Sequence, residues 1–554
     1  MVMSPSAQPG PGDEMTAVID RLRLLDAVQR GLPRYYQALL QQEDVVLRVS
    51  ALVALLELRA VWSDQAEQVV GYSRYGAVKR RAFPFFMEVQ EFDLAARVAH
   101  IASEDVDNLL TLRMEAELRL DYARMQELDW DLFLAHGSPD YLWDAQLKAE
   151  QGGGWRDAVP ATVRGILARP ADSLGAFHLL SRLRNANQPQ LVTRACDLFA
   201  RAKLFAAETA VFRAALLLDS GEFERASSWL QRMPDAMPSE SLTELALQLK
   251  AEALHKLRRY REAHSAYEKM NAVARSTTVD ARDYRKVVEF RAKLSIDEVH
   301  PDPRERDCPT LTGFPRSATT LLENVLEAHP HIEAFEEIPA FSRLTRFAER
   351  YAAKTNALSG ELVAKGKDLY FDEIRRNAKK PGARIYVDKL PTCSADAVFL
   401  KKVFPEKKYI FSIRHPYDVV LSCFRQTFVK NIAMENFRTL AEAAALYDFT
   451  MTQWFSVHSL DDASVCYVRY EQLVNEFQPT VERVLEFMGA EWDDAILGFA
   501  ESADRRYAKT PSYQKVRSGL SIGVQSSWQN YKFVFETKET AVLKKWVEHF
   551  GYPV

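Results

Sequence analysis

Residues 310–322 read TLTGFPRSATTLL, and this stretch decides the fold of the C-terminal half. A short β-branched run ends at Gly313, and the apolar spacing of a helix begins a few residues later, near Thr319. A strand, a tight turn and a helix N-terminus together leave unpaired backbone N–H groups and the positive end of a helix dipole, which favour a phosphate or sulfate. Arg316 adds a positive charge, and Ser317, Thr319 and Thr320 add hydroxyl donors. The stretch therefore predicts an anion-binding loop.

A nucleotide triphosphatase loop is the obvious competing interpretation, because its pattern G-x-x-x-x-G-K-[ST] also follows a strand. Counted from Gly313, Ala318 stands where that pattern has its second glycine, and Thr319 stands where it has the lysine that reaches the terminal phosphates. Both departures disfavour an ATPase of that type.

Three further runs after residue 309 resemble the first one in composition. They are RIYVDK (384–389), KKYIFSI (407–413) and SVCYVRY (464–470), and each is a short β-branched or aromatic run followed by a helix-like segment. Strands that alternate with helices are typical of a parallel sheet with helices on both faces. The C-terminal half is therefore predicted to be an α/β domain.

A second motif lies about a hundred residues after the loop, in YIFSIRHPYDVVLS (409–422). It places Arg414 at the end of a strand and Ser422 in the helix that follows. An arginine fork can bind a phosphate through two hydrogen bonds, and a hydroxyl two turns into the helix can point back to the same place. The motif predicts a second phosphate contact.

The loop PRSATT (315–320) and the 409–422 motif, in this order, resemble the sulfotransferase superfamily, which uses 3′-phosphoadenosine 5′-phosphosulfate (PAPS) and whose loop reads P-R-S-G-T-T. The resemblance implies a P-loop-like sulfotransferase domain with a central parallel sheet and PAPS as co-substrate. Arg414 and Ser422 would grip the 3′-phosphate. The loop residues around the 5′-phosphosulfate would be Pro315, Arg316, Ser317, Ala318, Thr319 and Thr320.

Two later segments extend this resemblance. Tyr470, in VRYEQLV, looks like the strand-end tyrosine of the family that lies near the cofactor. Ser526 and Trp528, in SSWQNY, look like the late loop that closes over the nucleotide. Two positions depart from the family pattern: Ala318 replaces a glycine, and Ser527 replaces an arginine common in bacterial relatives. Lys515 or Arg517 could supply the missing contact.

Sulfuryl transfer needs a base for the acceptor proton and a cation for the leaving oxygen. The stretch LLENVLEAHPHIEAFEE (321–337) resembles the tyrosylprotein sulfotransferases, and this resemblance implies Glu337 as the catalytic base and Lys389 as the cation, with Asp388 orienting it. The competing interpretations are a solvated surface carboxylate and an exposed loop lysine. His329 and His415 invite comparison with histidine-dependent sulfotransferases, but their neighbouring prolines favour structural roles.

Residues 17–296 are almost entirely helix-compatible, with apolar residues returning every three or four positions. The clearest unit spans residues 244–270, a second spans 211–233, and a weaker third surrounds Trp155. Small residues such as Ala251 and Ala263 would let two antiparallel helices approach closely. This half resembles a tetratricopeptide array, and an irregular helical bundle is the alternative before about residue 140. The resemblance implies a role in recruiting an acceptor protein or peptide.

The composition of the chain limits the partners, metal sites and locations that can be expected. Hydrophobic residues make up 47% of the 554 residues, the net charge is -4, and the five cysteines show no zinc or redox spacing. We therefore expect reduced thiols, no nucleic-acid partner, no metal site, no membrane span and a cytoplasmic location, and we leave the oligomeric state open. The predicted limits are a disordered segment 1–16, the repeats 17–296, a proline-rich linker 297–308 and the sulfotransferase domain 309–554.

Three hypotheses about function follow. The first is sulfation of a tyrosine on a protein or peptide, and the second is sulfation of a carbohydrate or another small hydroxyl compound. The third is a repeat scaffold whose sulfotransferase domain is inactive. A fragment beginning near Glu298 is expected to fold alone and bind the cofactor, unless the helices pack against the catalytic half as a wall of its site.

Overall fold

The computed structural model describes residues 125–129, 132, 162, 173–234, 236–273, 281–428, 431–499 and 527–553. The predicted N-terminal segment 1–16, the weak repeat around Trp155, and Ser526, Lys515 and Arg517 lie outside these ranges. The chain divides into two compact units, Met1–Leu242 and Thr243–Val554. The predicted linker 297–308 therefore lies inside the second unit, and the predicted domain limits stay a prediction.

The described part of the first unit is helical, as predicted. In the second predicted repeat, Ala214, Ala226 and Leu230 are buried, whereas Leu217 and Phe223 are half-buried. A tetratricopeptide superhelix stays a prediction. The helices are α10 (Ser173–Asn185), α11 (Pro189–Arg201), α12 (Ala206–Asp219) and α13 (Phe223–Gln231).

The helices that match the clearest predicted repeat are α14 (Glu240–Lys256) and α15 (Tyr260–Val273). Ala251 and Ala263 are fully buried between them, because small side chains allow the two helix backbones to approach. Together they form a helical hairpin, named here the α14–α15 hairpin. Helix α16 (Ala281–Lys293) follows it.

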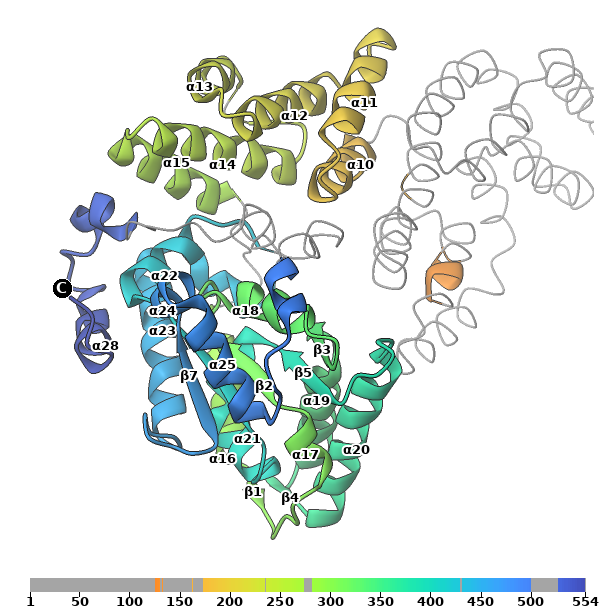
Figure 1. The fold of residues 1–554 in the computed structure, drawn as a ribbon. Helices are drawn as coiled ribbons and strands as arrows, with labels where there is room; N and C mark the ends of the chain where they lie inside the picture. Colours follow the sequence, from red (N-terminus) through yellow and green to blue (C-terminus); the bar gives the residue numbers. More distant parts are fainter. Residues whose placement is uncertain are drawn as a thin grey trace, which may run out of the picture. The chain divides into compact units, whose positions relative to one another are not determined.

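A five-stranded parallel sheet forms the centre of the second unit, with the strand order β3-β5-β2-β6-β7 (Figure 1). The four predicted strands are confirmed, whereas β3 and a two-stranded sheet formed by β1 and β4 were not predicted. The main strands are β2 (Thr310–Gly313), β3 (Ile332–Glu336), β5 (Ile385–Lys389), β6 (Tyr409–Ile413) and β7 (Val465–Arg469). The small sheet pairs β1 (Ser295–Ile296) with β4 (Ala357–Leu358).

Both faces of the sheet are covered, because successive strand residues point to opposite faces. In β6, Tyr409 and Phe411 belong to one apolar cluster, while Ile410 belongs to the other. One cluster includes residues of α16, α19 (Ala340–Ala352), α20 (Gly360–Asn377), α21 (Ala397–Val403), α22 (Pro416–Phe424), α23 (Leu440–Phe455) and α28 (Lys544–His549). The other includes α18 (Thr319–Glu327), α24 (Tyr470–Asn475) and α25 (Phe477–Met488).

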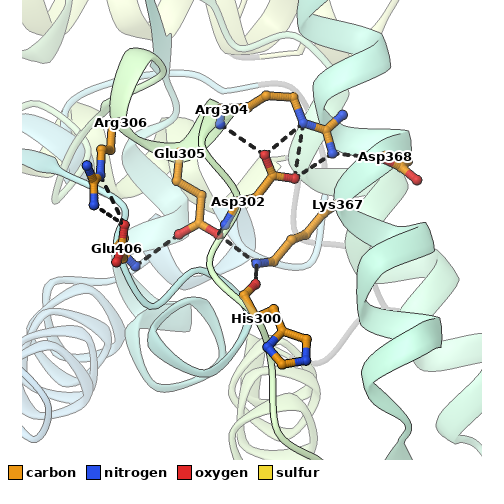
Figure 2. A network of polar contacts seen from close by, with 8 residues as sticks. All are labelled: His300, Asp302, Arg304, Glu305, Arg306, Lys367, Asp368 and Glu406. Carbon is orange, nitrogen blue, oxygen red and sulfur yellow. Dashed lines mark hydrogen bonds and ion pairs between the residues drawn. The ribbon is translucent and has the colours of Figure 1, made fainter.

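The segment before β2 is tied to the sheet domain by charged side chains (Figure 2). Glu305, in the short helix α17 (Arg304–Asp307), accepts a hydrogen bond of 2.6 Å from Lys367 Nζ, and both side chains are almost fully buried. Lys367 also donates to the His300 carbonyl, and the Glu406 backbone N–H donates to Glu305. This set of contacts is named here the Glu305 clamp. It anchors a proline-rich stretch that composition alone marks as a linker.

No helix in the described ranges is both long enough and apolar enough to cross a membrane. The five cysteines are free and buried. Among the described residues, no group of histidine, cysteine and carboxylate side chains could hold a metal ion.

Candidate active site

The topology places the two predicted motifs side by side. After β2 the chain crosses to β3 at one edge of the sheet, whereas after β6 it crosses to β7 at the opposite edge. Such a reversal opens a crevice at the carboxyl ends of the two neighbouring strands, where α/β proteins bind ligands. Gly313 pairs with Ser412 at this point, so the anion-binding loop and Arg414 leave adjacent strand ends.

The backbone of the loop, residues 313–318, is unusual. A Cβ added to Gly313 would lie 2.5 Å from the Ser412 carbonyl oxygen, so that no other residue fits without movement of the backbone. Arg316 has a φ of 73°, and Ala318, the N-cap of α18, has a φ of 83° and a ψ of 19°. Glycine adopts this left-handed region without a steric penalty, which gives a physical reason for the glycine that the family pattern has at position 318.

Side chains from three elements hold the loop in this shape. Ser412 Oγ donates a hydrogen bond of 2.6 Å to the Ser317 carbonyl, and Cys423 Sγ donates to the Pro315 carbonyl at 3.3 Å. Ser394 Oγ, from the 3-10 helix η1 (Pro391–Asp396), donates to the Gly313 carbonyl. Because three of its carbonyls accept hydrogen bonds from neighbouring elements, the loop is held in this shape.

Three arginines gather beside the loop. Arg316 Nε donates a hydrogen bond of 3.1 Å to Ser422 Oγ, and the Arg414 guanidinium lies over the Tyr470 ring at 4.6 Å. Arg425, the C-cap of α22, follows Ser422 by three residues and therefore lies on the same side of that helix. Burial, together with the positive charges of Arg414 and Arg425, lowers the pKa of Arg316 to about 10. Arg425 was not predicted from the sequence.

Several donors of this group are buried and lack a hydrogen-bond partner among the described residues. They are Ser317 Oγ, Arg414 Nε and Arg425 Nε. Buried donors in folded proteins are almost always paired, so three unpaired donors beside a positively charged loop fit an anionic ligand. The residues present therefore suit a nucleotide that carries phosphate or sulfate groups. Thr319 and Thr320, also predicted to bind it, are buried in the first turn of α18.

A lysine surrounded by carboxylates also lies at the carboxyl ends of the strands. Lys389, the last residue of β5, is fully buried, which excludes the alternative of an exposed loop lysine. Its Nζ lies 3.2 Å from Glu323, 3.8 Å from Glu336 and 3.0 Å from Glu337. The Glu323 side chain is 0% exposed, that of Glu336 is 9% exposed, and that of Glu337 is 40% exposed. Glu337 is thus the member of this group that an acceptor can reach.

The electrostatics keep Lys389 charged. Burial alone would lower the pKa of the Lys389 ammonium, but the charges of Glu323, Glu337 and Glu336 outweigh that effect and raise it. Glu323 was not predicted from the sequence. It lies one turn into α18, four residues after Thr319, and so connects the anion-binding loop to the lysine.

The late segment places Trp528 against the end of β6. The Trp528 ring stacks on His415 with a centroid distance of 4.9 Å, and its backbone N–H donates to Asp418 Oδ1 at 3.0 Å. Ser527 Oγ donates to the same carboxylate at 3.2 Å, so the position that departs from the family pattern has a structural partner.

The remaining candidates have structural contacts. His415 Nδ1 accepts from the Tyr417 N–H, and its Nε2 lies 3.1 Å from the Pro553 carbonyl. His329 Nδ1 accepts from the backbone N–H of residue 331, and burial lowers the pKa of both histidines. Asp388 accepts a hydrogen bond of 2.6 Å from Tyr370 and is not hydrogen-bonded to Lys389.

Fold and site together define a parallel α/β domain with an anion-binding loop at its topological switch point and a buried lysine surrounded by carboxylates nearby. Residues 310–494 match the profile of the Sulfotransferase family. These residues are a sulfotransferase-superfamily domain.

Two curated relatives align with part of the chain. An uncharacterized protein of Aquifex aeolicus is 24% identical over 301 residues, which cover 50% of this chain and 38% of that protein. Protein-tyrosine sulfotransferase A of Caenorhabditis elegans is 26% identical over 202 residues, which cover 33% of this chain and 50% of that protein. The chain thus spans half or less of the length of these relatives. A solved sulfotransferase domain, from the Synechococcus PCC 7002 olefin synthase, aligns with 47% of this chain and 98% of its own, at 19% identity and a TM-score of 0.34.

Proposed function

We propose that this protein transfers the sulfuryl group of PAPS to an acceptor hydroxyl. The observation that carries the proposal is the arrangement at one sheet edge, where unpaired donors beside the anion-binding loop lie near a buried lysine and a partly exposed carboxylate. Anion binding and a base with a neighbouring cation are the two requirements of group transfer from a phosphate carrier.

The loop residues and the arginines would hold the nucleotide. Arg316, Ser317, Thr319 and Thr320 would bind the 5′-phosphosulfate, while the 3′-phosphate would be bound by Arg414 and Ser422, whose hydroxyl already accepts from Arg316. PAPS, when bound, supplies the sulfuryl group. The α18 N-terminus contributes backbone N–H groups and the positive end of its dipole.

Glu337 would accept the proton of the acceptor hydroxyl, and Lys389 would stabilise the negative charge that develops on the reacting oxygens. Two observations support these roles: Glu337 Oε1 lies 3.0 Å from Lys389 Nζ, and the Glu337 carboxylate is partly exposed. Glu323 would act as a positioning residue, since its fully buried carboxylate lies 3.2 Å from the ammonium of the equally buried lysine.

A tyrosine on a protein or peptide is the acceptor that we propose, with the helical segment recruiting it. The support is the resemblance of residues 321–337 to tyrosylprotein sulfotransferases and the alignment with a protein-tyrosine sulfotransferase. A carbohydrate or another small hydroxyl compound is the alternative acceptor.

Incubation of the full chain with radiolabelled PAPS and a panel of tyrosine peptides, glycans and small phenols tests the proposal. Label on a tyrosine peptide supports the proposed acceptor, and label on a glycan or phenol alone supports the alternative. No transfer to any acceptor, together with no binding of 3′-phosphoadenosine 5′-phosphate (PAP), would overturn the assignment of function.

Glu337→Gln tests the base directly. We expect transfer to slow by about 10²–10⁴, the usual effect of losing a general base, while the affinity for PAP stays within about twofold. Glu336→Gln is the matched control, since Glu336 lies farther from Lys389 and is less exposed. A larger loss of transfer rate in Glu336→Gln than in Glu337→Gln would identify Glu336 as the base. Glu361→Gln, on the exposed face of α20, controls for the loss of a surface carboxylate.

A further inference from the structure

The helix end that carries Arg425 is buried against the α14–α15 hairpin, which precedes the part of the chain that matches the sulfotransferase profile. Phe424 belongs to the apolar cluster of that hairpin. Its ring lies 6.4 Å from the Tyr267 ring and 5.4 Å from the His264 ring. The C-terminus of α22 is therefore packed into the helical segment.

A single buried hydrogen bond fixes this helix end. Asn271 Nδ2, on α15, donates to the Phe424 carbonyl at 2.8 Å, and the Asn271 side chain is buried. The last carbonyl groups of a helix have no partner within the helix, so a donor from another element stabilises the end and sets its direction. Arg425 is the next residue, and its own N–H donates to the Leu421 carbonyl, so the Asn271 bond and the helix together restrain its backbone.

The Arg425 side chain lies close to two aromatic rings. Its guanidinium carbon lies 5.2 Å from the Tyr267 ring centre and 5.6 Å from that of Tyr531. Tyr531 is itself positioned by the hairpin, because its hydroxyl lies 3.0 Å from His255 Nδ1. Among the described residues Arg425 forms no ion pair, and its Nε has no hydrogen-bond partner. The negative charge of Glu252, on α14, interacts electrostatically with both Arg425 and Arg316.

Two more contacts bracket the same segment. Thr427 Oγ1 donates to Gln248 Oε1 at 2.8 Å, and Arg438 forms an ion pair of 2.7 Å with Glu244, with both of these side chains largely buried. Contacts from the hairpin thus constrain four described residues, Phe424, Arg425, Thr427 and Arg438. Two rings close to the guanidinium and a restrained backbone leave Arg425 few conformations, which reduces the entropy lost on ligand binding.

We infer that the α14–α15 hairpin is a structural part of the nucleotide site, in which Tyr267 and Asn271 act as positioning residues that aim Arg425 at the anion site of Arg316, Arg414 and Ser422. This inference rests on the proposed function. Its consequence is that a segment outside the sulfotransferase profile sets the affinity for nucleotides that carry a 3′-phosphate.

Calorimetric titration of the full chain with PAP and with AMP tests the inference. We expect Tyr267→Leu and Asn271→Ala each to weaken PAP binding about tenfold, the range for a lost charge-assisted hydrogen bond, and to leave AMP binding within about twofold. Arg425→Gln should show the same selective loss, and Arg425→Gln combined with Tyr267→Leu should lose no more than Arg425→Gln alone. In kinetics, the KM for PAPS should rise while kcat at saturating PAPS changes little.

Three controls separate positioning from general damage. Leu254→Ala removes packing from the same apolar cluster, and Arg259→Gln changes an exposed residue of the hairpin, so neither should alter the ratio of PAP to AMP affinity. Tyr267→Phe keeps the ring and should keep PAP affinity. If wild type fails to bind PAP, the proposed function fails. If wild type binds PAP and the folded Arg425→Gln and Asn271→Ala proteins bind it equally well, the inference is overturned.

Discussion

Gly313→Ala should be among the most damaging single substitutions in the second unit. Gly313 has a φ of 147°, where an L-residue is strained by about 1–3 kcal/mol. The added Cβ would also lie 2.5 Å from the Ser412 carbonyl oxygen and 2.8 Å from Ser317 Oγ. Because the closer of these atoms is backbone in a paired strand, relief requires movement of β2 or β6, and overpacking of this kind costs about 1–3 kcal/mol. The two effects together predict a loss of about 2–6 kcal/mol.

Gly489→Ala is the matched control. Gly489 ends α25 with a φ of 84°, and nothing lies within 4 Å of the position that its Cβ would occupy. Its substitution therefore reports the strain of a positive φ alone, about 1–2 kcal/mol before the partial offset from a less flexible unfolded chain. The difference between the two variants therefore reports mainly the clash with the Ser412 carbonyl, together with any difference in strain between a φ of 147° and one of 84°.

Urea unfolding of the full-length proteins, followed in parallel with PAP binding, measures both effects. We expect Gly313→Ala to unfold at much lower urea than Gly489→Ala and to lose PAP binding even where it is folded, since the loop must move away from Ser412. Equal unfolding midpoints for the two variants, with the slopes unchanged, would refute the close approach of β2 and β6 at this point.

Two further predictions concern charged side chains. Arg414→Ala should weaken PAP binding at least about tenfold and leave AMP binding nearly unchanged, because a charge-assisted bond to the 3′-phosphate contributes about 1.5–3 kcal/mol; calorimetry showing equal losses for the two nucleotides would contradict this role. Glu323→Gln should lower the free energy of unfolding by about 1–3 kcal/mol, because its carboxylate and Lys389 are both fully buried, whereas the partly exposed Glu337 should contribute less than about 1 kcal/mol. Urea titration of Glu323→Gln and Glu337→Gln measures the two losses of unfolding free energy. Equal losses would contradict a role for the difference in burial.

The strands that carry the site were predictable because their side chains follow a simple pattern. The segments that became β2, β5, β6 and β7 are short β-branched or aromatic runs, and the sheet buries both of their faces. Strand β3 was missed because Glu333 and Glu336 interrupt its apolar pattern. Glu333 Oε1 accepts from the Lys379 backbone N–H, a contact from a segment distant in sequence that no local pattern reveals.

The site was predictable only where its residues are adjacent in sequence. The loop 313–320 and the pair Arg414 and Ser422 each form a local motif, whereas Glu323 and Arg425 become meaningful only through contacts across the fold. In the sequence, Glu323 cannot be distinguished from a solvent-facing carboxylate of a helix. Only the folded structure brings Lys389 of β5 beside it. Likewise, Tyr267 lies within the clearest predicted repeat, residues 244–270, but its position against Arg425 depends on tertiary packing.

The Glu305 clamp and the elements before it limit where a shortened form of this protein can begin. Cutting near residue 298, where prolines and charges are dense, would remove β1 from its pairing with β4 and detach the hairpin and α16 from the sheet domain. A cut within the clamp would strand the Lys367 ammonium in an apolar interior without its carboxylate. The better start is Ser239, whose hydroxyl accepts from the Leu242 N–H in the first turn of α14. A shortened gene that begins there keeps the clamp, the hairpin and every described residue of the nucleotide site on one polypeptide.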